Sequence, residues 1–141
     1  MPSRKSSAIW EGNLKNGKGS MEVGDGVFTG NYSFGSRFEE EAGTNPEELI
    51  AAALAGCFSM ALAGELGNGG FTPQKIQTSA RLQLDKMENG FKISKIELTT
   101  RGKVEGITAQ KFSEFVEKAK VNCPVSRALK GVEITAQSNL E

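Results

Sequence analysis

Between positions 8 and 38, apolar and polar side chains alternate in short runs that glycine-rich segments separate. Gly17-Lys18-Gly19 and Gly24-Asp25-Gly26 are typical turn sequences. Alternation puts the apolar residues of a strand on one face, and the alternating residues here are Ala8, Trp10, Met21, Val23, Val27, Tyr32 and Phe34. The region 8–38 therefore predicts two or three short antiparallel strands.

A long helix is predicted to begin after Asn45. Asn45 is a suitable N-cap, Pro46 fits the first helical position, and Glu48 can complete a capping box. The helix is expected to end at the glycine-rich segment 67–70. Its apolar residues lie on every side, and they include Ile50, Leu54, Cys57, Phe58 and Leu62.

A helix that is apolar all round has to be covered all round, and a chain of 141 residues has little material for that. A second copy of the chain is therefore expected to supply part of the cover. The uncharged run 49–64 is short for the hydrocarbon core of a bilayer. We therefore predict a buried core helix and no membrane partner.

The next segment predicts a long β-hairpin. Alternating apolar residues run from Ile76 to Leu84 and continue from Phe91 to Leu98, and Asn89-Gly90 between them predicts a type I′ turn. The spacing of three between Ile93 and Ile96 breaks the period of two, which predicts a bulge or a change of face there.

The last third of the chain predicts two helices and a strand. Thr108 can cap a helix whose apolar stripe is Phe112, Phe115, Val116 and Ala119. Pro124 then begins a short helix through Leu129, and 132–136 predicts a last strand. The order of elements predicts an α+β fold, with antiparallel sheets around a central helix, in a single domain over 1–141.

The charges of the chain are balanced, with 17 basic and 17 acidic residues and no block of either sign. The electrostatic attraction that drives nucleic-acid binding is therefore missing, and no nucleic-acid partner is expected. Residues 1–10 are not followed by the apolar segment of a secretory signal, so we expect a cytoplasmic location.

Two cysteines are the candidates for chemistry, and the chain has no histidine. Cys-His catalysis and His-metal ligation are thus excluded, and no metal or cofactor is expected. Cys57 in the helix could also be a small core residue, whereas Cys123 before Pro124 stands at a helix N-cap that favours a thiolate. Arg37 and Glu47 have structural roles available too, as a surface charge and as a carboxylate in the first helical turn.

Glu47 and Cys57 are ten residues apart in the predicted helix, so they lie about 15 Å apart and about 80° out of phase. They cannot meet within that helix. If Glu47 takes part in a site at Cys57, it has to come from a second chain.

Four stretches of the chain form a recognisable set: Arg37-Phe38-Glu39, Gly43-Thr44-Asn45-Pro46-Glu47-Glu48-Leu49-Ile50, Ala55-Gly56-Cys57-Phe58-Ser59-Met60-Ala61-Leu62 and Asn122-Cys123-Pro124-Val125-Ser126. Together they resemble the signature of the OsmC/Ohr family of hydroperoxide reductases. Trp10-Glu11-Gly12, Gly17-Lys18-Gly19 and the position of Arg37 resemble the OsmC (osmotically inducible protein C) branch. The resemblance extends over nearly the whole chain.

The resemblance implies an antioxidant, stress-response peroxidase that is an intertwined homodimer with two sites at its interface. Cys57 would attack an organic hydroperoxide and become a sulfenic acid, and Cys123 would convert it to a Cys57–Cys123 disulfide. An external dithiol, of the lipoyl type, would restore both thiols.

Arg37 would lower the pKa of Cys57 and orient the peroxide, and Glu47 would hold Arg37 through a bidentate pair. Phe38, Phe58 and Met60 are candidates for the apolar walls of the site. Two other functions stay open: a non-catalytic dimer that binds small apolar ligands, and a peroxide sensor. The second would need a partner surface or a DNA-binding element, and the sequence contains no helix-turn-helix.

Overall fold

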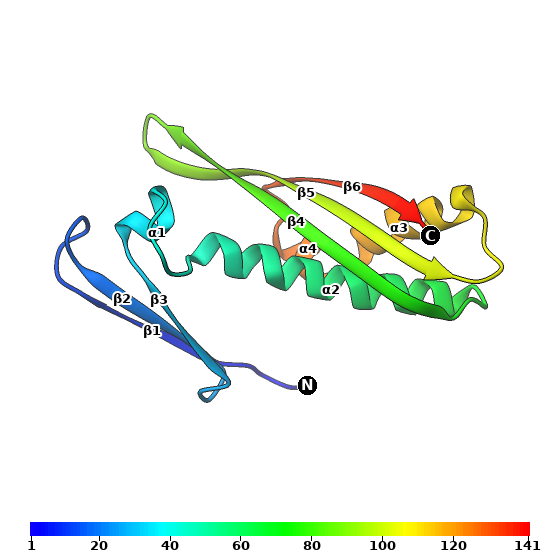
Figure 1. Ribbon diagram of the computed structural model, residues 1–141, viewed down its shortest axis with the longest axis horizontal. Coiled ribbons are helices and arrows are strands. Elements are labelled where there is room, and N and C mark those ends of the chain that lie inside the picture. The colour runs from blue at the N-terminus through cyan, green and yellow to red at the C-terminus, as the bar shows by residue number, and fades with distance from the viewer. The chain divides into compact units, whose positions relative to one another are not determined.

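A computed structural model describes residues 1–141. They form two compact units, Met1–Leu49 and Ile50–Glu141. The chain contains six strands in two three-stranded sheets and four helices, which is the predicted α+β class (Figure 1). The single domain expected over 1–141 stays a prediction.

The first unit contains the antiparallel sheet predicted for this region. Its strands are β1 (Ser6–Glu11), β2 (Lys18–Val23) and β3 (Phe28–Tyr32), in the order β1-β2-β3. Gly19 pairs with Trp10 on one side and Tyr32 on the other. A Cβ atom at Gly19 would come within 2.6 Å of both rings, so only glycine fits between them.

Helix α1 (Phe34–Phe38) follows β3, where we had predicted strand. The Ser36 backbone N–H donates to Ser33 Oγ at 3.0 Å, and the Ser33 N–H donates back to Ser36 Oγ at 2.8 Å. This reciprocal serine pair starts a helix in a segment whose apolar alternation suggests a strand. It places Arg37 in the last turn of α1.

Helix α2 (Pro46–Asn68) begins and ends where the sequence predicted. The Glu48 N–H donates to Asn45 Oδ1 at 2.8 Å, which confirms Asn45 as the cap. The second half of the expected capping box is not formed, because Glu48 Oε2 accepts a bond of 2.9 Å from Thr44 Oγ1 instead. Asn45 Nδ2 donates to Ser36 O at 3.0 Å, which ties the start of α2 to α1.

One stripe of α2 is buried, at every fourth position: Leu54, Phe58, Leu62 and Leu66 are each 0% exposed. Other positions of the helix are open to solvent, and Met60 is 79% exposed. The single chain thus leaves part of α2 uncovered, and the second copy expected to complete the cover stays a prediction. By length and composition alone α2 could cross a membrane, but core helices of soluble proteins can have the same length and composition.

The second unit is built on β4 (Pro73–Met87), β5 (Gly90–Val104) and β6 (Glu133–Leu140). Strands β4 and β5 form the predicted long hairpin (Figure 1). Gln83 pairs with Lys95 and Leu84 pairs with Ile93, which leaves Ser94 as the extra residue of a bulge. The break in period between Ile93 and Ile96 is thereby confirmed.

The turn of this hairpin differs from the predicted type I′ turn. Met87 pairs with Gly90, so the two loop residues are Glu88 and Asn89. Within this turn φ is positive only at Gly90, where it is 122°. A type I′ turn needs positive φ at both central residues, which are Glu88 and Asn89 here.

Strand β6 runs parallel to β5, so the expectation of purely antiparallel sheets is wrong here. The reason is the intervening pair of helices, α3 (Ala109–Asn122) and α4 (Pro124–Ala128), since a crossover connection returns the chain in the same direction. Thr108 Oγ1 caps α3 by accepting from the Lys111 N–H at 3.1 Å, as predicted. The core combines the buried stripe of α2 with residues of β5 and α3, among them Ile96, Leu98, Phe112, Val116 and Ala119.

Candidate active site

The two cysteines meet in the second unit. Cys57 lies in the middle of α2, and Cys123 stands between α3 and α4 as the N-cap of α4, as predicted. Their Sγ atoms are 2.8 Å apart, and both are free thiols. Two sulfurs at this distance need only a small movement to form a disulfide.

The two thiols differ in exposure. Cys123 is 0% exposed and belongs to the hydrophobic core, whereas Cys57 is only partly buried. Cys57 is therefore the more accessible of the two cysteines.

The pKa values of the two cysteines move in opposite directions. Burial raises the pKa of the Cys57 thiol, and its hydrogen bond with Cys123 raises it further. Burial also opposes ionisation of Cys123, but hydrogen bonds from Cys57, Ser126 and Val125 outweigh it and lower the Cys123 pKa. In the isolated subunit Cys123 is thus the thiol that ionises more readily.

Arg37 and Glu47 form an ion pair within the first unit. Arg37 Nε donates to Glu47 Oε1 at 2.8 Å, and the Glu47 side chain is only 10% exposed. The expected bidentate pairing is not formed, because Glu47 Oε2 is buried without a hydrogen-bond partner. The bond uses Nε alone, so the terminal guanidinium nitrogens of Arg37 stay available as donors.

A hollow of about 210 Å³ in the first unit adjoins Arg37, and it is lined by Trp10, Leu14, Tyr32, Ser33, Phe34, Arg37 and Phe38. Phe38 was a predicted wall residue, and the Arg37 guanidinium carbon lies 5.1 Å from the centre of its ring. The other two guesses lie elsewhere: Phe58 is fully buried in the core, and Met60 is an exposed residue of α2.

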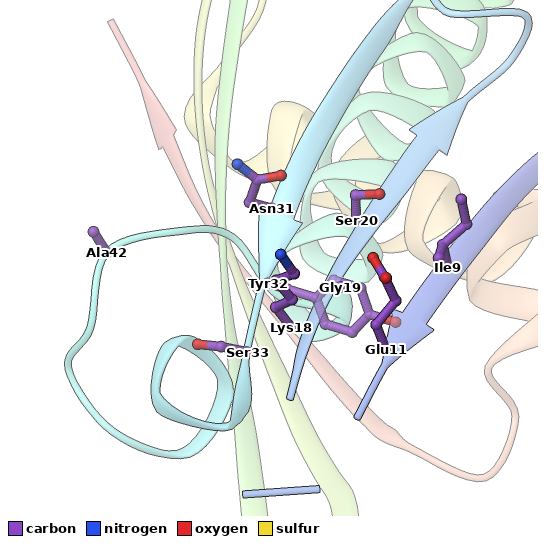
Figure 2. Close-up of a pocket in the computed structure, with 9 residues that line it drawn as sticks. All are labelled: Ile9, Glu11, Lys18, Gly19, Ser20, Asn31, Tyr32, Ser33 and Ala42. Carbon is purple, nitrogen blue, oxygen red and sulfur yellow. The ribbon is translucent and has the colours of Figure 1, made fainter. Parts of the chain in front are cut away.

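A second hollow, of about 480 Å³, lies on the β1-β2-β3 sheet (Figure 2). Its lining combines opposite charges from Glu11 and Lys18 with Tyr32, Asn31 and Ser20, as Figure 2 shows. None of the four predicted site residues lines it. No group of three or more Cys, Asp or Glu side chains in the chain is arranged to hold a metal ion.

The sequence reasoning assigned no role to the polar residues around Cys123. Asn122 Nδ2 donates to Glu65 Oε1 at 3.1 Å, which connects the end of α3 to α2. The Ser126 hydroxyl is buried, and Ser126 helps to lower the pKa of Cys123. The only signal in the sequence for a role of Asn122 and Ser126 is their position beside Cys123, in Asn122-Cys123-Pro124-Val125-Ser126.

The fold is α+β, and it holds two free thiols in contact, one partly buried and one fully buried, an arrangement that suits dithiol redox chemistry. The sequence profile described as OsmC-like protein matches residues 38–137. The chain belongs to this OsmC family, as the motifs indicated.

Several relatives show the same affiliation. The chain is 50% identical over 139 residues to Peroxiredoxin OsmC of Escherichia coli, covering 98% of this chain and 96% of the relative. It is 31% identical over 99 residues to the organic hydroperoxide resistance protein OhrA of Bacillus subtilis, covering 69% and 68% of the two chains.

Among solved structures, OhrB of B. subtilis matches with a TM-score of 0.70 at 26% identity, over 97% of this chain and 98% of that one. An organic hydroperoxide resistance protein OsmC of Legionella pneumophila shares the fold with a TM-score of 0.76 at 23% identity, over 99% of each chain. With this membership the chain is an oxidoreductase of the peroxidase type.

Proposed function

We propose that the chain reduces organic hydroperoxides to alcohols, with Cys57 as the attacking sulfur and Cys123 as the resolving sulfur. The observation that carries the proposal is the 2.8 Å contact between two free thiols of unequal exposure. The sulfur of the more exposed cysteine reacts with the peroxide. The sulfur of the buried cysteine lies close enough to form a disulfide after a small movement. The names of the relatives, a peroxiredoxin and organic hydroperoxide resistance proteins, support this substrate class.

The reaction has three steps: oxidation of Cys57 by the peroxide, condensation of Cys57 and Cys123 to a disulfide, and reduction of that disulfide. The Cys57 thiolate attacks the terminal peroxide oxygen, the O–O bond breaks, and the alkoxide leaves and takes a proton to become the alcohol. Cys57 is now a sulfenic acid, and the Cys123 thiolate attacks its sulfur and displaces hydroxide, which leaves as water. An external dithiol, of the lipoyl type in our proposal, reduces the resulting disulfide by exchange.

The attack requires a thiolate on Cys57, which burial and Cys123 oppose in the isolated subunit. A cation beside Cys57 would reverse this order, since an opposite charge stabilises the charged form. Arg37 has the right chemistry, because Glu47 holds its Nε and leaves its terminal nitrogens free to face a sulfur or a peroxide oxygen.

We infer that Arg37 and Glu47 of one subunit complete the Cys57 site of a partner subunit in a homodimer. Glu47 and Cys57 stand ten residues apart on the same helix, about 15 Å along its axis, so one helix cannot join them. The uncovered part of α2 supports a dimer, since Gly56, Met60 and Gly64 are open to solvent. A second copy would remove this apolar surface from water.

The aromatic hollow beside Arg37 supports the preference for organic over inorganic peroxide. Trp10, Tyr32, Phe34 and Phe38 offer apolar surface for an alkyl or aryl group, and Arg37 lies in the same lining. Hydrogen peroxide has no apolar group and gains nothing from such walls. We further propose a cytoplasmic location, where reducing dithiols are abundant.

A turnover assay tests the proposal. Cumene hydroperoxide and hydrogen peroxide are offered as substrates to wild type, Cys57→Ser and Cys123→Ser, with dihydrolipoamide as the reductant. We expect wild type to prefer the organic peroxide, Cys57→Ser to be inactive, and Cys123→Ser to react once without cycling. Absence of turnover in wild type would instead favour a non-catalytic dimer that binds apolar ligands.

A further inference from the structure

Asn122 sits at a junction of three helices in the second unit. Its amide nitrogen donates to Glu65 Oε1 on α2 at 3.1 Å. Its amide oxygen accepts from a terminal nitrogen of Arg127 on α4 at 3.3 Å. Asn122 itself is the last residue of α3. One side chain therefore connects the helix that carries Cys57 to the two helices that flank Cys123.

The Glu65 carboxylate is the anchor of this junction, and its side chain is 15% exposed. Oε1 accepts from Asn122, and Oε2 pairs with Lys118 Nζ at 3.4 Å. Lys118 is 60% exposed, so its contribution is screened by water. The Asn122 bond is the better shielded of the two. A largely buried carboxylate that loses such a donor is left with a desolvation cost that no hydrogen bond offsets.

The charges around Asn122 fix the orientation of its amide. The nitrogen faces the Glu65 carboxylate and the oxygen faces the Arg127 guanidinium, which is the only arrangement that satisfies both. A flipped amide would set two acceptors against each other on one side and two donors on the other. The junction is therefore a directional connection, unlike apolar packing, which tolerates sliding.

Cys123 immediately follows Asn122, and its sulfur is buried 2.8 Å from Cys57 Sγ. To form the disulfide, the Cys123 sulfur has to approach the Cys57 sulfur in line with the S–O bond that breaks. Small displacements of reacting groups lower the rate of such a step by large factors. A connection from α2 to the residue before Cys123 restricts such displacements directly.

We propose that Asn122, through Glu65, is a positioning residue for the resolving step, in which Cys123 attacks oxidised Cys57. The inference rests on the proposed function for the identity of that step. The hydrogen bonds of the Asn122 side chain go to Glu65 and Arg127 and to neither sulfur, so its replacement should change how fast the disulfide forms and leave the first oxidation of Cys57 unchanged.

The test reverses the polarity of the Asn122–Glu65 bond. Asn122→Asp removes the donor and places two carboxylates next to each other. Glu65→Gln keeps an acceptor for Asn122. In the double variant the amide introduced at position 65 can donate to the carboxylate introduced at position 122, so the bond is restored in the opposite direction. Lys118→Ala is the matched control, since it removes the exposed partner of the same carboxylate. Rapid-quench thiol alkylation measures disulfide formation, and each variant with Cys123→Ser gives the rate of the first oxidation.

We expect Asn122→Asp to slow disulfide formation about tenfold or more without changing the first oxidation, and the double variant to recover most of that loss. Glu65→Gln and Lys118→Ala should stay within about twofold of wild type, since each keeps the bond. A wild-type rate in Asn122→Asp would overturn the proposal, as would equal slowing of both steps or a double variant no better than Asn122→Asp.

A second measurement separates this inference from the proposed function. The equilibrium constant of the Cys57–Cys123 disulfide against glutathione depends on how well the thiols are positioned and needs no peroxide chemistry. It should fall about tenfold in Asn122→Asp and recover in the double variant. If wild type does not react with peroxides, this comparison still decides the role of Asn122, and an unchanged equilibrium constant would contradict it.

Discussion

Cys57 Sγ and Cys123 Sγ are 2.8 Å apart within one subunit, yet their pKa values diverge, with Cys57 raised and Cys123 lowered. Burial disfavours ionisation of both, but hydrogen bonds with Cys57 and Ser126 lower the pKa of Cys123, so Cys123 is the thiol that ionises more readily. The arrangement suits the resolving step, in which Cys123 is the nucleophile. The first step needs the opposite distribution, and that need makes Arg37 central to our account.

Replacement of Arg37 is predicted to impair the first step. Arg37→Gln removes the cation that we propose to stabilise the Cys57 thiolate, so the second-order rate constant for cumene hydroperoxide should fall about 10²-fold. The acidic limb of the pH–rate profile should move to higher pH, because the thiolate then forms only at higher pH. Stopped-flow oxidation measures both quantities. The exposed Arg101 on β5 provides the control, and Arg101→Gln should leave them unchanged.

Removal of Cys123 is predicted to lower the pKa of Cys57. Burial would still raise that pKa, but the second cause, the hydrogen bond with Cys123, is absent in Cys123→Ala. At a given pH below the pKa, more Cys57 is then ionised. Titration by ultraviolet thiolate absorbance should give a single pKa that lies below the higher of the two macroscopic values of wild type. A value equal to or above that higher one would contradict the claim that the hydrogen bond with Cys123 raises the pKa of Cys57.

The dimer can be tested at Met60, which is 79% exposed on α2. Met60→Glu places a charge on the surface that we expect a second subunit to cover, so the protein should dissociate and lose its peroxidase activity together. Sedimentation velocity gives the oligomeric state. Met87→Glu, at a residue 52% exposed at the end of β4, should leave both unchanged. A Met60→Glu protein that stays dimeric and active would remove this surface from the interface.

The buried stripe of α2 predicts a large effect on stability. Phe58 is 0% exposed in the core, and Phe58→Ala should lower the free energy of unfolding by about 3–5 kcal/mol. Urea denaturation of wild type and variant measures the difference at equal protein concentration. Leu62 and Phe58 lie on the same stripe, so Leu62→Ala should fall in the range of about 2–5 kcal/mol. Changes below about 1 kcal/mol at both positions would contradict the packing described for α2.

Local patterns predicted much of the fold. Asn45 and Pro46 marked the start of α2, the apolar stripe of α3 was buried as expected, and the spacing from Ile93 to Ile96 revealed the bulge at Ser94. Each of these features depends on residues close together in sequence, whose spacing is visible without the structure.

Features that depend on distant partners escaped prediction. The parallel pairing of β6 with β5 depends on where the α3–α4 crossover returns the chain. The apolar alternation around Phe34 predicted a strand, but the reciprocal hydrogen bonds of Ser33 and Ser36 start helix α1 there. The Asn122–Glu65 bond joins residues 57 positions apart, and no local pattern indicates it. The site residues Cys57, Cys123, Arg37 and Glu47 came from motif resemblance, and their chemical roles stay predictions.

The most direct test is a single-turnover reaction of fully reduced protein with one equivalent of cumene hydroperoxide, followed by mass spectrometry of the intact chain and of its peptides. We predict that wild type loses two hydrogens and yields a peptide linked through Cys57 and Cys123, and that Cys123→Ser gains one oxygen on Cys57. Recovery of unmodified thiols in wild type, or oxidation that begins at Cys123 when Cys57 is replaced by serine, would contradict the account.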